Sequence, residues 1–175
     1  MKFRNPDKNE RTRINRALDR WGAFEFFKDK SLLVTQKDDT KKVLVWLVSN
    51  TIEKLMIPMT HSYSLGLAIG ELRKEFVPTI AGADLFARYG KRNKFYVVLN
   101  EKAEKLVLYG RDIMGESVVE ASTALAENEL VILLDSSFDA LGIGRTRFSG
   151  NSLLEKGRVT FTTITDAGYY LREEG

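Results

Sequence analysis

The sequence contains no cysteine and only one histidine, His61. Without thiols there can be no disulfide, no cysteine-ligated zinc or iron–sulfur site and no thiol nucleophile, which suits a reducing, intracellular setting. A single imidazole cannot supply the histidine pairs that bind many metal ions. His61 lies between two polar residues in a segment typical of a loop, and no serine has the surroundings of a nucleophile. We therefore expect no catalytic residues, no metal ion and no cofactor.

Long hydrophobic runs are also missing. The longest, Val43–Val48, has the length of a β-strand, whereas a membrane-spanning helix needs roughly 20 apolar residues. Residues 1–20 are polar and charged and lack the apolar region of a secretory signal. We expect no membrane partner and a cytoplasmic location, or a nucleolar one if the source is a eukaryote. The absent cysteines and the short chain favour an archaeal cytoplasm.

Phosphate-binding glycine loops are absent as well. The glycines at 66 and 70, and those at 142 and 144, match neither the dinucleotide fingerprint nor the longer phosphate loop with its Lys and Ser/Thr. Inside a strand pattern, Gly142 and Gly144 indicate a bulge or a bend of a barrel. The sequence therefore predicts no small-molecule substrate.

Positive charge is unevenly distributed along the chain. The formal net charge is +3, but residues 1–94 carry 19 Lys and Arg against 11 Asp and Glu. Residues 95–175 carry 8 against 13, a net charge of −5. The first part suits an anionic partner, whereas the second cannot bind nucleic acid by bulk charge alone.

The first half of the chain predicts helices and a small antiparallel sheet. The expected elements are a helix over Asn5–Phe27, strands over Ser31–Thr35 and Lys42–Val48 joined by a hairpin at 37–40, a helix over Asn50–Ile57, and a helix over Ala83–Tyr89 closed by Gly90. The segment Tyr63–Leu72 fits either a closely packed helix or a bent strand. Pro78 and Gly82 are expected to interrupt the pattern.

The second half predicts several short strands and one early helix. The expected strands are Phe95–Leu99, Val118–Ala121, Glu129–Leu134, Ala140–Thr146 and Arg158–Thr163; the helix is Glu101–Leu108, and a helical turn or two covers Asp166–Arg172. Short strands at close spacing are typical of a small barrel. We expect an α+β protein with an N-terminal α/β domain at residues 1–92 and a β-barrel domain at 93–175. The boundary falls in the basic run 91–94, where the charge balance changes sign.

Basic residues are the best candidates for a binding site. Arg13, Arg16 and Arg20 share a face of the first helix, where they either contact phosphates or form a solvated face paired with Glu10 and Asp19. In the second half, five of the eight positive charges lie at glycine-containing turns and strand ends: Arg111, Arg145, Arg147, Lys156 and Arg158. Alternation along a strand places Arg145 and Arg147 on one face.

The order of these elements resembles that of a known RNA-binding module. The stretch holds a strand at Phe95–Leu99, a helix at Glu101–Leu106, a turn at Leu108–Ile113, and a strand pair at Leu130–Asp135 and Ala140–Gly144 that closes on Gly-Ile-Gly. In this it is similar to a PUA domain. More narrowly, three segments resemble, in their order and spacing, motifs of the Nip-seven family of ribosome-biogenesis factors: Tyr63–Gly66, Leu108–Gly110 and Asp166–Arg172.

This resemblance implies a PUA-type barrel that contacts RNA and an N-terminal domain that contacts protein partners. It implies a non-catalytic factor that binds pre-rRNA or rRNA and assists large-subunit maturation together with other ribosome-assembly proteins. Arg158 matches a position at which the family contacts RNA. Val159, Thr162 and Thr165 stand where some relatives carry Arg or Lys, and the neighbouring Arg145 and Arg147 can compensate.

Three functional hypotheses follow. The first is RNA binding through Tyr109, Arg111, Arg145, Arg147, Lys156 and Arg158, with Arg13, Arg16 and Arg20 as a second site. Tyr109 and Phe148 can stack on unpaired bases. The alternative is a protein–protein adaptor whose barrel has lost most RNA affinity, in line with the −5 charge of residues 95–175. An RNA-modifying enzyme, the third, has no methyl-donor or nucleotide loop to support it.

Overall fold

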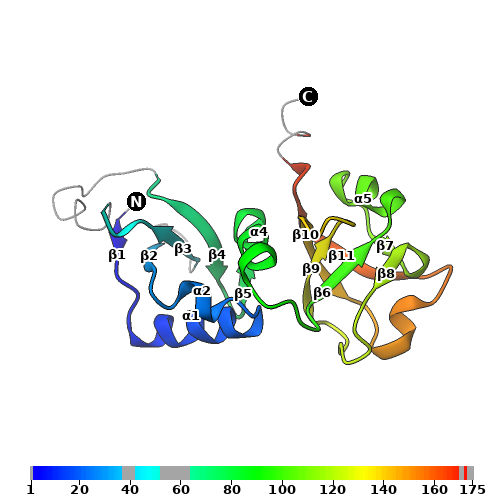
Figure 1. The fold of residues 1–175 in the computed structure, drawn as a ribbon, viewed down its shortest axis with the longest axis horizontal. Coiled ribbons are helices and arrows are strands. Elements are labelled where there is room, and N and C mark those ends of the chain that lie inside the picture. The colour runs from blue at the N-terminus through cyan, green and yellow to red at the C-terminus, as the bar shows by residue number, and fades with distance from the viewer. Residues whose placement is uncertain (1, 37–41, 52–63, 170–171, 173–175) are drawn as a thin grey trace. The chain divides into compact units, whose positions relative to one another are not determined.

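The computed structural model describes residues 2–36, 42–51, 64–169 and 172 (Figure 1). The chain forms two compact units, Met1–Gly90 and Lys91–Gly175, each with a sheet of its own. The expected hairpin connection at 37–40 and most of the expected helix over Asn50–Ile57 lie outside the described residues. Among the described residues, no helix combines the length and the apolar character that crossing a bilayer requires.

The first unit contains an antiparallel sheet whose strands follow one another in chain order. The strands are β1 (Phe3–Arg4), β2 (Ser31–Gln36), β3 (Val43–Val48), β4 (Leu67–Leu72) and β5 (Phe76–Pro78). Both strands predicted for this part, β2 and β3, are present. For the described part of the segment Tyr63–Leu72 the strand alternative holds over Leu67–Leu72: β4 pairs with β3, with a register shift between Val45 and Trp46.

Both faces of this sheet are covered. Leu33 and Trp46 are paired neighbours on one face, where they form a small cluster with Val48. The Trp46 ring packs edge-on against Phe3, and its Nε1 donates a hydrogen bond of 2.9 Å to the Thr35 hydroxyl. On the other face, the pair Val34 and Val45 is fully buried. Because side chains alternate along β2 and β3, these two strands contribute apolar residues to both faces of the sheet.

Two helices replace the single one predicted over Asn5–Phe27, which corrects that prediction. Helix α1 spans Lys8–Arg20 and the short α2 spans Phe24–Phe27. The break falls at Gly22, whose φ of 67° lies in the left-handed region that glycine adopts without strain at a helix C-terminus. The apolar stripe continued past this point because the bend keeps both helices on the same core.

Helix α4 (Ile80–Tyr89) begins earlier than the sequence predicted. Thr79 caps its N-terminus, with the hydroxyl accepting from the Gly82 amide at 3.0 Å and donating to the Ala68 carbonyl at 2.6 Å. Gly82 was expected to interrupt the pattern, and that expectation was wrong: it lies in the first turn, where the helix passes close to β4. Gly90 caps the C-terminus as predicted, its amide donating to the Phe86 carbonyl.

Aromatic rings fill the core of the first unit. Trp21 stacks on Phe86 with 6.5 Å between ring centroids, and Phe27 meets Phe86 edge-on at 5.6 Å. Phe76 of β5 lies 6.3 Å from the same ring. Phe86, at the centre of α4, therefore joins both N-terminal helices and the sheet.

The second unit contains a sheet of mostly antiparallel strands. Its elements are β6 (Tyr96–Leu99), α5 (Glu101–Leu108), β7 (Ile113–Met114), the 3-10 turn η1 (Gly115–Ser117), β8 (Val118–Glu120), β9 (Leu130–Leu134), β10 (Ala140–Thr146), the 3-10 turn η2 (Gly150–Leu154) and β11 (Val159–Asp166). The strand order is β7-β11-β10-β9-β6-β8, and only the β6–β9 pair is parallel within the described residues. Asn100 caps α5 by accepting from the Ala103 amide at 3.0 Å.

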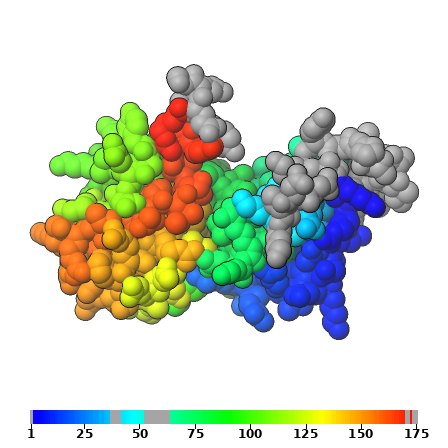
Figure 2. Space-filling model, turned by 180° about the vertical axis from the view of Figure 1, so that it is seen from behind, coloured from blue at the N-terminus to red at the C-terminus, as the bar shows by residue number. Residues whose placement is uncertain are grey.

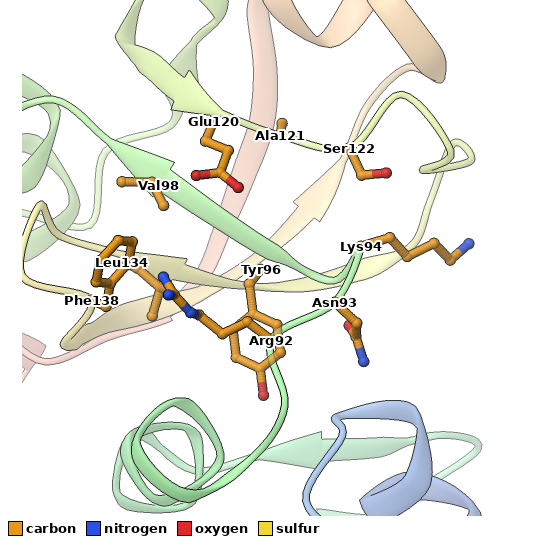
Figure 3. Close-up of a pocket in the computed structure, with 10 residues that line it drawn as sticks. All are labelled: Arg92, Asn93, Lys94, Tyr96, Val98, Glu120, Ala121, Ser122, Leu134 and Phe138. Atoms are coloured by element: carbon orange, nitrogen blue, oxygen red, sulfur yellow. The ribbon is translucent and has the colours of Figure 1, made fainter.

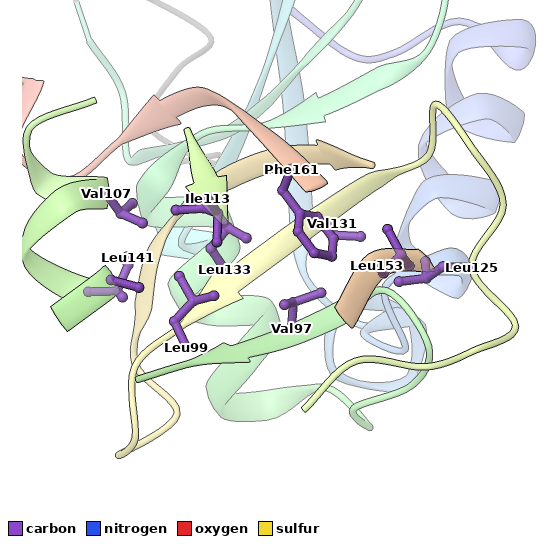
Figure 4. Packing of buried hydrophobic residues seen from close by; sticks show 11 residues of the cluster. Val97, Leu99, Val107, Ile113, Leu125, Val131, Leu133, Leu141, Leu153 and Phe161 are labelled. Atoms are coloured by element: carbon purple, nitrogen blue, oxygen red, sulfur yellow. The ribbon is translucent and has the colours of Figure 1, made fainter. Parts of the chain in front are cut away.

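The sheet curls into a nearly closed barrel. Its first and last strands, β7 and β8, follow each other directly in the chain and are joined only by η1, so the two ends of the sheet lie together. The barrel interior holds Val97 and Leu99 of β6, Val131 and Leu133 of β9, and Phe161 of β11 (Figure 4). Helix α5 contributes Val107, which packs into the same cluster.

The fold class is confirmed as α+β, with an antiparallel sheet and helices followed by a small β-barrel. Helix α5 and strand β10 have the predicted bounds, and β6, β8, β9 and β11 differ from them at their ends. The helical turn expected from Asp166 is wrong at its start, because β11 continues through Asp166. Strand β7, with only two residues, was not predicted.

Candidate nucleic-acid interface

The β10–β11 pair aligns most of the basic residues singled out in the second half. Arg145 pairs with Thr162, and the Arg147 amide donates to the Thr160 carbonyl at 2.9 Å. Thr146, between the two arginines, pairs with the core residue Phe161. Since side chains alternate along a strand, both arginines point to the outer face. We call Arg158, Arg147, Arg145 and Arg111, in their order along β11, the basic row.

The first residue of the basic row, Arg158, is held by two neighbours. Its guanidinium carbon lies 3.9 Å from the centroid of the Phe148 ring, and its Nη1 forms an ion pair with Glu155. That hydrogen bond, followed by one from Ser152, lowers the pKa of the Glu155 carboxyl. Arg158 keeps 46% of its side chain exposed. One face of Phe148 is thus covered by a guanidinium, which offers a flat cationic surface of its own.

Lys156 lies in the turn that leads into β11. The next residue, Gly157, donates its amide to Oε2 of Glu116 at 2.9 Å. The pKa of the Glu116 carboxyl is lowered by its own backbone amide, then by that of Gly157, and to a smaller degree by the charge of Lys156. Lys156 is exposed. The turn is therefore anchored through its backbone, and the ammonium group faces solvent.

In the middle of the basic row, the two arginines of β10 differ in how far their side chains are exposed to solvent. Arg145 is half-buried, and its Nη1 donates to the Asn128 carbonyl at 2.7 Å, which draws it toward the loop before β9. Arg147 is exposed. The segments that contain β10 and β11, coloured from yellow to orange, lie side by side on one face of the unit (Figure 2). Of the two arginines of β10, Arg147 is accordingly the one that a ligand can reach more easily.

Arg111 and Tyr109 lie at the far end of the basic row. The Thr163 hydroxyl donates to the Arg111 carbonyl at 2.7 Å, which holds Arg111 beside β11 on the side opposite β10. From Arg158 to Thr163 is five residues, about 16 Å of strand. Tyr109 is 69% exposed and Arg111 is exposed. The structure therefore places Arg147 beside Thr160 and Arg145 beside Thr162 of β11, two and four residues along the chain from Arg158. Tyr109 and Arg111 lie at a distance from Lys156.

Another cation at this end, Arg172, was missed as a candidate. Its guanidinium forms a two-point pair with the buried Asp166 carboxylate, both bonds at 2.9 Å, and donates to the Leu108 carbonyl. Asp166 accordingly raises the pKa of Arg172. The pair joins the end of β11 to the end of α5. Asp166 and Arg172 are six residues apart, a spacing that neither a helix nor a strand would bring together. Only the position of Arg172 in the C-terminal motif Asp166–Arg172 could have indicated its role.

The arginines of α1 are partly engaged within the first unit. Nη2 of Arg13 donates to the Arg73 carbonyl, and the guanidinium of Arg20 lies 5.5 Å from the centroid of the Trp21 ring. Arg16 is exposed. Of the three residues proposed as a second site, two are thus half-buried, Arg13 with a hydrogen bond and Arg20 with a ring contact, which leaves Arg16 as the accessible charge.

The chemistry of the basic row is that of a binding surface. Guanidinium groups donate in pairs to phosphate oxygens, and the flat Arg158–Phe148 stack suits an unpaired base. Within the described residues, no three His, Asp or Glu side chains gather closely enough to hold a metal ion. The basic row thus combines positively charged guanidinium groups with the flat surface of the Arg158–Phe148 stack, arranged along one strand.

Comparisons with known proteins match both parts of the chain. The family model described as the NIP7/UPF0113 pre-PUA domain matches residues 3–80, and that of the UPF0113 PUA domain matches residues 95–175. A UPF0113 protein of Archaeoglobus fulgidus is 36% identical over 176 residues, which is 99% of this chain and 97% of that protein.

Solved structures agree in fold. A conserved PUA domain protein from Thermoplasma acidophilum has a TM-score of 0.71 at 15% identity, over 98% of both chains. A PUA domain from Aeropyrum pernix K1, solved as a tartrate complex, has a TM-score of 0.64 at 16% identity, over 98% of this chain and 89% of that one. From the family models and the archaeal relative together, we conclude that the chain belongs to the NIP7/UPF0113 family.

Proposed function

We propose that this protein is a non-catalytic RNA-binding factor that assists rRNA maturation and large ribosomal subunit assembly. The basic row of the PUA domain contacts RNA phosphates, with Lys156 and Tyr109 at its two ends. The observation that carries the proposal is the pairing of β10 with β11, which places Arg145 and Arg147 beside β11 on the outer face of the barrel. Membership of a PUA family supports RNA as the partner.

The charge distribution supports a local contact. Residues 95–175 carry a net charge of −5, so RNA approaches this unit against its overall charge and is held where arginines are concentrated. With three or four phosphate contacts to a single strand, the logarithm of the affinity should fall against the logarithm of salt with a slope of about −2 to −3. A general basic surface would give a steeper slope.

The test is a titration of the full chain with a fluorescent uridine-rich RNA at several salt concentrations. The double variant Arg145→Glu and Arg158→Glu should reduce affinity by about tenfold or more, because two phosphate contacts become repulsions. The matched control is Lys2→Glu with Lys8→Glu, which changes the net charge equally at exposed positions outside the basic row. Equal losses in both double variants would contradict the proposal.

The adaptor alternative has one observation in its favour. Arg158 is paired with Glu155 and covers Phe148, so part of the charge of the basic row is already neutralised. If the wild-type protein shows no RNA binding at low salt, a protein–protein adaptor is the better explanation. If the variant with Arg145→Glu and Arg158→Glu binds RNA as the wild type does, the basic row does not hold the RNA, and the binding site is the second one, Arg13, Arg16 and Arg20 of α1, or the barrel serves as an adaptor.

The cellular setting belongs to the same proposal. We expect the N-terminal domain, residues 1–92, to contact other ribosome-assembly proteins, and the protein to act in an archaeal cytoplasm without a membrane or small-molecule partner. The relative from Archaeoglobus fulgidus supports an archaeal source. Crosslinking in cells, mapped to nucleotide and residue, would test both the RNA segment and the partners.

A further inference from the structure

A pocket in the second unit lies away from the basic row, on the outer face of the sheet (Figure 3). Its volume is about 410 Å³, and it is lined by Arg92, Asn93, Lys94, Tyr96, Val98, Glu120, Ala121, Ser122, Leu134 and Phe138. Val98 pairs with Glu120 on one side and Leu134 on the other, so the three form a row across β8, β6 and β9. Val97 and Leu99 point into the barrel, which places Val98 on the opposite face.

One wall of the pocket is an aromatic ring in an unusual backbone setting. Phe138 is 39% exposed and has a φ of 66°, a conformation that a bulky residue rarely adopts. The turn is stabilised by Asp135, whose Oδ1 accepts from the amides of Ser137 at 2.8 Å and Asp139 at 2.9 Å. Such conformations are frequent where a side chain is presented to a ligand.

A guanidinium lies on this ring. The Arg92 side chain places its central carbon 3.6 Å from the Phe138 centroid. The floor beneath is apolar and buried, formed by Val98 and Leu134. A flat cationic stack beside an apolar floor matches the shape and the polarisable faces of a planar heteroaromatic ring.

The opposite wall carries an available carboxylate. Glu120 is exposed, and among the residues that the structure describes we find no hydrogen bond or ion pair to it. The nearby ammonium of Lys94 is engaged elsewhere, at 3.2 Å from Glu129 Oε1 and 3.2 Å from the Ala124 carbonyl. Both oxygens of Glu120 can therefore accept hydrogen bonds from a ligand.

We infer that this pocket binds the guanine base of an unpaired RNA nucleotide. The inference rests on the proposed function and adds a base-specific contact to the phosphate contacts of the basic row. Guanine alone among the RNA bases places two donors side by side, at N1 and N2, and so meets an ionised carboxylate with two parallel bonds. Uracil offers one donor flanked by carbonyls, which repel the carboxylate, and adenine and cytosine pair their amino group with a ring acceptor.

The experiment compares two fluorescent RNA octamers on the full chain, one of uridine only and one with guanosine at its two central positions. The wild-type protein should bind the guanosine octamer about tenfold more tightly, within the range for a two-bond base contact. Glu120→Gln should remove that preference. Glu101→Gln, which removes an exposed carboxylate outside the pocket, should leave it unchanged.

Two variants of Phe138 separate binding from folding. Glycine adopts a positive φ without strain, so Phe138→Gly should keep the thermal midpoint while losing the guanosine preference. Phe138→Tyr retains the ring and should retain the preference. In a nitrogen-15 NMR titration, the guanosine octamer should shift the amides of Tyr96, Val98 and Glu120.

The outcomes distinguish this inference from the proposed function. Equal affinity for the two octamers, or a preference that survives Glu120→Gln and Phe138→Gly, overturns the pocket assignment and leaves the basic row in place. If neither octamer binds, both fail. If the pocket amides respond to acetyl-arginine amide and not to RNA, the occupant is a protein side chain, which also overturns the inference.

Discussion

Gly82 lies in the first turn of α4, where the helix passes close to the backbone of β4. A Cβ atom at this position would lie 1.8 Å from the Ile69 carbonyl oxygen, far inside contact distance. Alanine normally stabilises a helix relative to glycine, by up to about 1 kcal/mol. Here the opposite holds, because the obstacle is main chain from a neighbouring strand, which cannot rotate out of the way.

Gly82→Ala should therefore lower the free energy of unfolding by about 2–3 kcal/mol, as overpacking against the main chain does. Urea denaturation followed by circular dichroism measures the loss. Ala87→Gly, in the same helix, is the matched control and should lower it by only about 0.5–1 kcal/mol through glycine's backbone entropy. A Gly82→Ala protein as stable as the wild type would show that α4 can move away from β4.

At the scale of elements, the start of α1 depends on Glu10. Its carboxylate accepts from Arg4 at 2.6 and 2.7 Å and from the Asp7 amide at 2.9 Å, while Asp7 accepts from the Glu10 amide at 2.8 Å. The pair with Arg4 is the main reason that the pKa of Glu10 is lowered. One carboxylate thus ties β1 to the helix and completes its cap.

Glu10→Gln should cost roughly 1–2 kcal/mol of stability at neutral pH, a modest value because Arg4 is 40% exposed and screened by solvent. The pKa of Glu10 is lower in the folded protein than in the unfolded chain, where it is about 4.3, so the ionised carboxylate stabilises the fold at any pH above that value. This stabilisation is lost as the pH falls through the folded-state pKa. The stabilities of wild type and variant should therefore begin to approach each other as the pH falls below the unfolded value, and they should meet only below the lowered folded-state pKa of Glu10.

The same comparison with Glu101→Gln, at an exposed carboxylate, should show little difference at any pH. A gap between wild type and Glu10→Gln that persists undiminished in acid would mean that the packing of the side chain, and not its charge, stabilises α1.

Elements in which apolar residues recur at a regular spacing could be predicted from the sequence, and elements too short for such a spacing could not. Helix α5 and strand β10 have eight and seven residues, enough for a period to appear, and both have the predicted bounds. Strands β1 and β7 have two residues each and exist only because a longer partner pairs with them. The break at Gly22 was hidden because the apolar stripe continues on both sides of it.

The residues of the candidate interface likewise divide into those that a local sequence pattern predicted and those that only the fold brings together. Alternation alone predicted that Arg145 and Arg147 share a face, because they lie on one strand. The pocket could not be predicted, since Glu120, Val98 and Leu134 come together only through the register of three strands far apart in the chain. Phe138 was not singled out either, because a phenylalanine gives no sign of the positive φ that it adopts in the turn held by Asp135. The role of each predicted RNA contact stays a prediction.

At the scale of the whole molecule, the barrel has a core of its own. The cluster that fills it draws every member from residues 97–161, all within the second unit. A fragment of residues 91–175 should therefore fold by itself. Well-dispersed amide resonances and a cooperative thermal transition would confirm this, whereas a collapsed spectrum would show that the barrel needs residues 1–90.

The position of β11 has a consequence for how the protein is made. It is the last strand of the described chain, yet it lies inside the sheet, between β7 and β10. The parallel pairing of β6 with β9 likewise waits for the intervening residues 100–129, and such long-range contacts fold slowly. During synthesis the barrel cannot close until β11 has emerged, and a nascent chain that ends before Arg158 has no strand on which to assemble the basic row. Affinity for RNA should thus appear abruptly and late, only once translation has passed β11.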